Sequence, residues 1–143
     1  MSESIRVIVQ EPFKKAEVKF INNTLEEKQA IVGGYIEYIP YNPSFEENYT
    51  MYGNEEAKIL QLPYNFPMFY QMDGNTQLSD VILGTVLILK TNAEGQDVSL
   101  DQDDVDHILN LMENKEDDVK ELQFEEILFL DAVKTKGMNQ VFE

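Results

Sequence analysis

The sequence predicts an α+β fold: a mixed or antiparallel sheet of about five strands, a short helix packed on that sheet, and one or two acidic helices near the C-terminus. Three observations lead to this prediction. Alternating, β-branched segments recur through residue 90, a short helical pattern interrupts them, and acids gather on helical patterns in the last third of the chain. With 143 residues, the chain has the usual length of one domain and can bury a core without disulfides.

The first two predicted strands form a hairpin. Residues 5–10 alternate, so that Ile5, Val7 and Val9 face one way. A turn at Pro12 leads to residues 16–20. The expected buried face of this second strand consists of Ala16, Val18 and Phe20.

A helix of about two to three turns is expected next, ended by glycine. Asn23 or Thr24 can cap its start. Its expected apolar stripe consists of Leu25, Ala30, Ile31 and Val32. Either Gly33 or Gly34 is expected to take the left-handed conformation that ends the helix. Residues 35–39 then form the third strand.

The middle of the chain is predicted to form a second hairpin, a loop and a central strand. After a loop at residues 41–48, residues 49–52 form a fourth strand, and residues 58–60 pair back with it. Residues 61–73 contain two prolines, which predict an irregular loop. This loop either covers an edge of the core or presents a contact surface, through Tyr64, Phe66, Met68, Phe69 and Tyr70. Residues 81–90 are expected to form one central strand.

The clearest helix is predicted at residues 101–112. Ser99 or Asp101 can cap it. Its apolar positions recur at helical spacing, which leaves the acids on the outer face: Val105, Ile108, Leu109 and Met112. Residues 119–133 are expected to form a further helix, although residues 127–130 would also suit a strand, and fraying is expected from Lys134.

Charge is the strongest compositional feature. The chain carries 11 basic and 27 acidic residues, a net charge of −16. Such a surface repels phosphates, so we expect no direct binding of nucleic acid or of an anionic membrane. It attracts a basic partner, although solubility alone is the simpler interpretation. No signal peptide or apolar run of membrane length is visible, so we expect a cytoplasmic protein.

The acids are concentrated in one part of the chain. Between Glu94 and Glu126 there are thirteen acids and two lysines. On successive helical turns such carboxylates can imitate a phosphate backbone and occupy a basic nucleic-acid groove; a solvated helix face is the alternative. The residues expected to form this partner-binding face are Asp101, Asp103, Asp104, Asp106, Glu113, Asp117 and Asp118.

Catalytic and metal-binding patterns are nearly absent. The acidic cluster fails the calcium-loop template, because Asp106 and Met112 stand where that loop needs Gly and a bidentate Glu. The one histidine, His107, lies three residues after Asp104, but no third group orients the pair and no nucleophile is marked. With no cysteine, thiolate chemistry is excluded. We therefore expect a non-enzymatic protein without a metal or a cofactor.

Several ordered motifs resemble a known family. They are VGGYIE at residues 32–37, NEEAK at 54–58 followed by LPYN at 62–65, LGT at 83–85, SLDQD at 99–103, and the opening strand at 7–18. In this combination, residues 5–112 resemble DUF3846, a family of small proteins of unknown function carried by phages, prophages and mobile elements of Gram-positive bacteria. Phe66 departs from the Arg that members often have there, and the segment after Asn114 exceeds the usual family length. We expect a family-like core at residues 1–114 and an acidic extension at 115–143.

These observations favour an accessory protein that binds and inhibits a basic host protein, such as a defence nuclease, by mimicking DNA with its acidic helices. The resemblance implies the genetic setting, and the charge implies the partner. A second hypothesis is a module that binds a nucleotide-like ligand with Tyr35, residues 54–65 and the aromatic stretch. A third is a structural or homodimer-forming module that uses the surface at residues 64–70.

Overall fold

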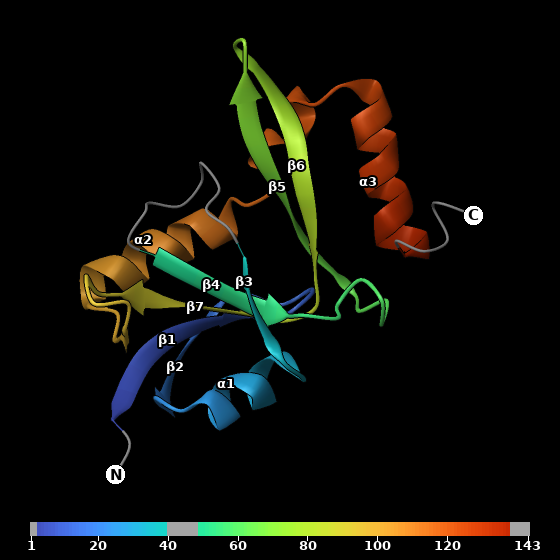
Figure 1. Ribbon diagram of the computed structural model, residues 1–143. Helices are drawn as coiled ribbons and strands as arrows, with labels where there is room; N and C mark the ends of the chain where they lie inside the picture. The colour runs from blue at the N-terminus through green and yellow to red at the C-terminus, as the bar shows by residue number, and fades with distance from the viewer. Residues whose placement is uncertain (1–2, 40–48, 138–143) are drawn as a thin grey trace.

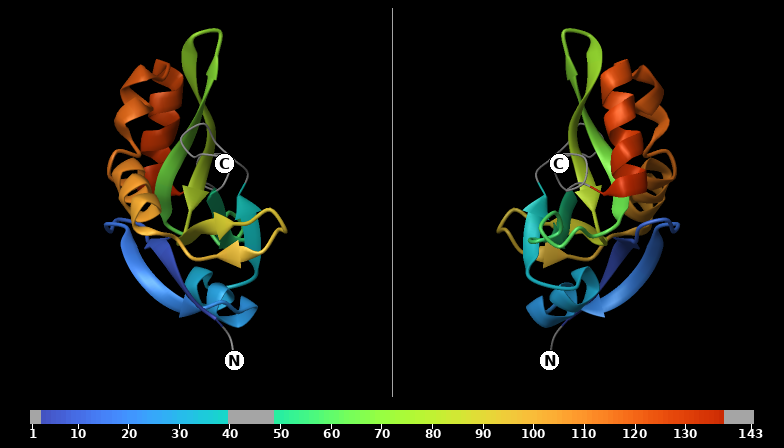
Figure 2. Two further views of the ribbon diagram at one scale, coloured as in Figure 1. Left: turned by 90° about the vertical axis from the view of Figure 1, so that its left-hand side faces the viewer. Right: turned by 90° about the vertical axis from the view of Figure 1, so that its right-hand side faces the viewer.

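The computed structural model describes residues 3–39 and 49–137 and confirms the α+β fold (Figure 1, Figure 2). Its strands are β1 (Ser4–Gln10), β2 (Glu17–Asn22), β3 (Ile36–Ile39), β4 (Tyr49–Asn54), β5 (Tyr64–Met72), β6 (Asn75–Leu83), β7 (Val86–Thr91) and β8 (Asp97–Val98). Its helices are α1 (Leu25–Val32), α2 (Gln102–Glu113), the 3-10 helix η1 (Asp117–Glu121) and α3 (Phe124–Lys136). Six strands form one antiparallel sheet in the order β2-β1-β7-β4-β3, with β8 beside β7, and β5 and β6 form a separate hairpin.

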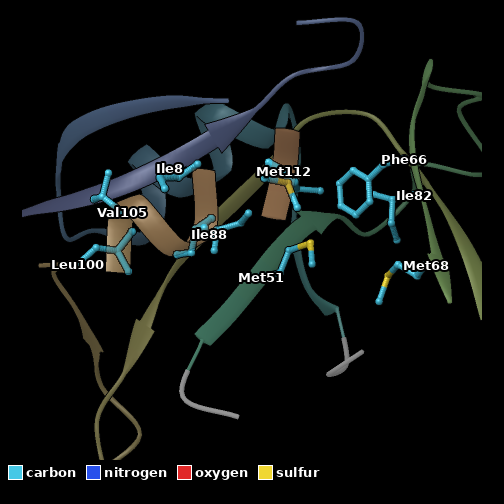
Figure 3. Close-up of a cluster of buried hydrophobic side chains, with 11 residues drawn as sticks. Ile8, Met51, Phe66, Met68, Ile82, Ile88, Leu100, Val105 and Met112 are labelled. Carbon is cyan, nitrogen blue, oxygen red and sulfur yellow. The ribbon is translucent and has the colours of Figure 1, made fainter. Parts of the chain in front are cut away.

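Helices α1 and α2 cover opposite faces of the large sheet (Figure 1). Because successive side chains of a strand point to opposite faces, β1 and β7 supply both layers of core. On the α1 face the buried residues are Ile5, Val7, Val9, Leu87 and Leu89, together with Val32. On the α2 face they are Ile8, Val86 and Ile88, with Val105, Ile108 and Met112 (Figure 3). That second layer continues into the hairpin through Phe66, Met68 and Ile82 (Figure 3).

The predicted hairpin of the first two strands is confirmed, but its expected buried face is wrong. Strand β1 pairs with β2 antiparallel, with Ile8 opposite Val18 and Ile5 opposite Ile21. Val18 is 39% and Phe20 70% exposed, whereas Ile21 is buried. Val18 lies opposite Ile8 and therefore on the α2 side, but α2 covers β1 and β7 and leaves the edge strand β2 open on that side.

Helix α1 has the predicted caps and a different buried face. The Thr24 hydroxyl accepts a hydrogen bond from the Glu27 N–H, and Gly33 takes the left-handed conformation with φ 80°. Leu25 is exposed, contrary to the expected stripe. Lys28 is buried in its place, because its ammonium forms an ion pair with the Asp97 carboxylate.

The predicted second hairpin, in which residues 58–60 pair back with residues 49–52, is wrong, and β4 pairs with β3 instead. Strand β4 pairs with β3 on one side and with the central strand β7 on the other. Both of its edges are therefore occupied, and residues 55–61 form turns. The predicted loop at residues 41–48 lies outside the described residues.

The stretch predicted as an irregular aromatic loop is strand β5, so that prediction is wrong. Pro67 is tolerated because β5 is one half of a two-stranded ribbon, where a missing ladder donor can face away from the partner. Tyr64, Phe66, Met68 and Phe69 are buried and Tyr70 is half-buried. The side chains suggested as a contact surface are thus mainly core, as the alternative interpretation had it.

Gly84 divides the predicted central strand at residues 81–90 into two. The chain leaves the hairpin at Leu83, turns at Gly84 with φ 77°, and enters the large sheet at Val86. Only the second half, β7, is central, between β1 and β4.

Replacing Gly84 by alanine is expected to destabilise the protein more than replacing Gly74. Both glycines have positive φ, which costs an alanine about 1–2 kcal/mol. At Gly84 the added Cβ would also lie 2.7 Å from Leu62 Cδ1, whereas nothing lies within 4 Å at Gly74. We expect about 1 kcal/mol of additional loss at Gly84 from this overpacking, measured by urea unfolding. Equal losses at the two sites would contradict the close contact with Leu62.

The C-terminal segment is helical and packs on the hairpin (Figure 2). Helix α3 runs from Phe124 to Lys136, so the predicted helix is confirmed and the alternative of a strand at residues 127–130 is wrong. The expected fraying from Lys134 is also wrong for residues 134–136, which belong to this helix. Its buried side chains, Leu130 and Val133, lie against Phe69, Val81 and Leu83 of the hairpin. In the described part of the chain, no helix has the length and apolarity needed to cross a membrane.

Candidate functional site

Most of the predicted acidic residues are exposed near α2. Asp101 caps α2, and its carboxylate accepts from the backbone of Asp104. Asp103, Asp106 and Glu113 are exposed along the helix, within an arc of about 80° at 3.6 residues per turn. We call these three residues the acidic stripe. Asp117, at the start of η1, is also exposed, and Asp118 beside it is half-buried.

Asp104 does not belong to the exposed face, and its prediction there is wrong. Asp104 is 6% exposed. Its carboxylate lies 2.8 Å from the Lys90 ammonium, accepts a hydrogen bond of 2.8 Å from the Tyr49 hydroxyl, and accepts another of 2.9 Å from the Asp101 backbone N–H. These contacts attach the start of α2 to strands β4 and β7, so Asp104 is a structural residue.

The environment of Asp104 stabilises its charged form. Burial acts to raise the pKa of this carboxyl, but the hydrogen bonds from Lys90, the Asp101 backbone and Tyr49 outweigh it, so the pKa is lowered. The hydrogen bond with Asp104 raises the pKa of Lys90 in turn. Both shifts favour the ion pair at neutral pH.

The histidine next to these acids is part of an aromatic contact. The His107 ring lies 5.9 Å from that of Tyr49, centroid to centroid, at an interplanar angle of 30°. Among the residues that the structure describes, no group of three or more His, Asp or Glu side chains is placed to hold a metal ion. Gly33 and Gly34 lie at the end of α1, where Gly33 supplies the turn predicted for the pair.

A second candidate site, which the sequence did not predict, is a cavity of about 610 Å³. Its walls come from the end of β1, the following turn, the start of β5, the end of α2 and helix α3. Four of the chain's 11 basic residues line it: Lys14, Lys15, Lys115 and Lys134. Sequence reasoning missed these lysines because they are scattered along the chain; only the adjacent pair at 14–15 is visible as a cluster.

One wall of the cavity is a hydrogen-bonded network. The Tyr64 hydroxyl donates to Glu116 Oε1 over 2.5 Å, and the Lys134 ammonium lies 2.9 Å from the same oxygen and 5.2 Å from the centre of the Tyr64 ring. Burial and the Glu116 hydrogen bond raise the pKa of the Tyr64 hydroxyl. Burial works to raise the pKa of Glu116, but Tyr64 and Lys134 outweigh it and the pKa is lowered. Lys134 and Glu116 therefore form an ion pair, whereas Lys115 forms no ion pair with a described residue.

Comparisons with known proteins identify a family. The sequence profile of one family, a domain of unknown function (DUF3846), matches residues 5–113. The comparison with curated proteins and the comparison with solved structures each find no match. The matched range ends at the last residue of α2, so η1 and α3 lie outside it. Because the match covers well over half of the chain and includes most of its strands, the chain belongs to the DUF3846 family.

Proposed function

We propose that this protein is a non-enzymatic accessory protein that binds a basic host protein in the cytoplasm through the acidic stripe of α2. The observation that carries the proposal is that those carboxylates are exposed and form no ion pair with a described residue. Asp103, Asp106 and Glu113 are exposed, and no ion pair between residues 3–39 and 49–137 uses them. A row of carboxylates that no described cation neutralises, on a chain with a net charge of −16, attracts a cationic surface.

The spacing of the stripe supports a partner that normally binds nucleic acid. Asp103 and Glu113 are ten residues apart, which is about 15 Å along a helix at 1.5 Å per residue. Exposed carboxylates over that length form a negative row comparable to backbone phosphates, and a basic nucleic-acid groove has the complementary charge. On this proposal the bound protein covers the groove and inhibits the partner, a defence nuclease being one such protein. The resemblance of its motifs to proteins of phages and mobile elements supports that setting.

Reversing three exposed acids near α2 is expected to weaken partner binding and flatten its salt dependence. The test variant carries Asp103→Lys, Asp106→Lys and Asp117→Lys. The matched control carries Glu26→Lys, Glu37→Lys and Glu94→Lys, three exposed acids on α1, β3 and the turn before β8. Both variants have the same net charge, so only the position of the change differs.

The measurement begins with capture from host lysate, identification of proteins released by high salt, and purification of the basic protein found. The rate at which this protein associates with each variant is then measured at low and at high ionic strength. We expect about a tenfold or larger decrease for the test variant and a smaller one for the control. Equal decreases would show that net charge alone attracts the partner, and an unchanged rate for the test variant would exclude Asp103, Asp106 and Asp117 from the interface.

A further inference from the structure

Two buried amide side chains adjoin the lysine-lined cavity. Gln10 is 0% and Asn65 4% exposed, and both line the cavity. The Gln10 Nε2 group donates to the backbone oxygens of Glu11, at 2.8 Å, and Lys14, at 2.6 Å. The Asn65 Nδ2 group donates to the backbone oxygens of Gln10, at 2.9 Å, and Gly84, at 2.7 Å. Each NH₂ group thus uses both of its hydrogens on backbone carbonyls.

These bonds determine which way each amide points. Turning either amide over would set its oxygen against two carbonyl oxygens, so the orientation follows from the network. Gln10 Oε1 and Asn65 Oδ1 are consequently left buried with no hydrogen-bond partner in the described part of the chain. Buried polar atoms are nearly always paired, and an unpaired one is destabilising. Both oxygens belong to side chains that line the cavity, so a ligand with N–H donors that displaced the atoms covering them would supply the missing hydrogen bonds.

The charge of the cavity indicates an anionic group on the same ligand. Lys15 and Lys115 form no ion pair with any other described residue. Burial lowers the pKa of Lys115, and the nearby charge of Glu116, which forms its ion pair with Lys134, opposes this only in part. In a chain of net charge −16, this is a local excess of positive charge. A phosphate group at Lys15 and Lys115 would supply the missing counter-charge.

A ring at the edge of the cavity indicates that the ligand is planar in part. Phe13 lines the cavity, yet it is 77% exposed. Its neighbours in the wall include the apolar side chains of Leu109 and Met112. An exposed aromatic face beside hydrogen-bond acceptors is the arrangement on which nucleobases stack.

We propose that this cavity binds a mononucleotide: the base stacks on Phe13 and donates to Gln10 Oε1 and Asn65 Oδ1, and the phosphate contacts Lys15 and Lys115. The cavity volume of about 610 Å³ is in the range of small-molecule sites. Of the acidic stripe, Glu113 lines the cavity, whereas Asp103 and Asp106 do not, so variants of these two residues separate this proposal from the proposed binding of a basic protein.

The full chain is titrated with GMP, AMP, CMP and UMP. Inorganic phosphate and the free nucleosides, which each contain one part of a nucleotide, are titrated for comparison. Binding is followed by calorimetry and by the side-chain amide NMR signals of Gln10 and Asn65. We expect at least one nucleotide to bind more tightly than its nucleoside or phosphate and to shift both amide signals. The Asp103→Lys, Asp106→Lys variant is expected to bind it equally well, which keeps this test independent of the partner proposal.

Matched variants assign the contacts. Lys15→Gln and Lys115→Gln are each expected to weaken nucleotide binding about tenfold or more, while Lys120→Gln, an exposed lysine outside the cavity, leaves it unchanged. Phe13→Ala is expected to weaken binding about tenfold. Phe20→Ala is its control, since Phe20 is 70% exposed on the same hairpin but outside the cavity.

Three results would overturn the proposal. In the first, none of the four nucleotides shifts the amide signals at millimolar concentration, and the cavity holds water only. In the second, inorganic phosphate binds as tightly as every nucleotide and Phe13→Ala has no effect, which identifies a simple anion site. In the third, the Lys15 and Lys115 variants bind as well as the wild type, which places the nucleotide elsewhere.

Discussion

Replacing Leu130 by alanine is expected to destabilise the protein by about 2–5 kcal/mol, the range for truncating a large core side chain. Leu130 is 0% exposed in α3 and lies in the cluster that covers Phe69, Val81 and Leu83 of the hairpin. Chemical unfolding in urea measures the loss.

Leu128 provides the matched control for this substitution. It belongs to the same helix and has the same side chain, but it is 51% exposed. Leu128→Ala is expected to change the free energy of unfolding by less than about 1 kcal/mol. If the two variants are equally stable, α3 does not cover the hairpin core.

This result would also show how the segment outside the family match relates to the rest of the chain. The family profile ends at residue 113, before η1 and α3. Leu122, Leu130 and Val133 nevertheless belong to one buried cluster with side chains of β5 and β6. The acidic C-terminal segment therefore completes the core of the hairpin in addition to carrying charge.

Replacing Asp104 by alanine is expected to destabilise the protein by about 3 kcal/mol, the lower end of the range for breaking a buried ion pair. The lower end applies because the Lys90 side chain is 25% exposed and can regain water, whereas that of Asp104 is 8% exposed. The substitution also removes the acceptor of the Tyr49 hydroxyl and half of the capping box of α2. Asp103→Ala, at the exposed neighbouring position, is the control and is expected to have a small effect.

The effect of Asp104 should depend on pH with a defined sign. Because its folded-state pKa is lowered from the ordinary value of 3.8, the unfolded chain binds the proton more readily than the folded protein. The carboxylate therefore stabilises the fold above that ordinary value, and the stabilisation is lost as the pH falls through the folded pKa. The difference in unfolding free energy between wild type and Asp104→Ala should thus shrink on acidification. A constant difference from neutral pH into strong acid would contradict the charged pair with Lys90.

Elements that depend on neighbouring residues were predictable from the sequence. Thr24 caps α1, Gly33 ends it in the left-handed conformation, and Asp101 caps α2. The hairpin of β1 and β2 was equally visible from alternation and a turn. Each of these features involves atoms only a few residues apart, so residue type and spacing are sufficient to identify it.

Features that depend on distant residues were decided by the tertiary structure alone. Asp104 has the sequence context of an exposed helix-start acid, but Tyr49 and Lys90, from two strands, make it a buried ion-pair residue. The aromatic stretch forms a strand despite Pro67, because β6 pairs with it and two buried clusters cover its side chains, one shared with α2 and one shared with α3.

The cavity is the clearest case of a feature that only the folded chain contains. Lys15 comes from the turn after β1, Lys115 from the turn after α2 and Lys134 from α3. The Asn65 amide donates to the Gln10 backbone across the fold, which brings together the two residues whose side-chain oxygens have no hydrogen-bond partner among the described residues. The sequence by itself determined the fold class, the helix caps and the overall negative charge. Which charges are neutralised and which polar atoms lack partners depends on contacts between residues far apart in the chain, and only the tertiary structure decided those.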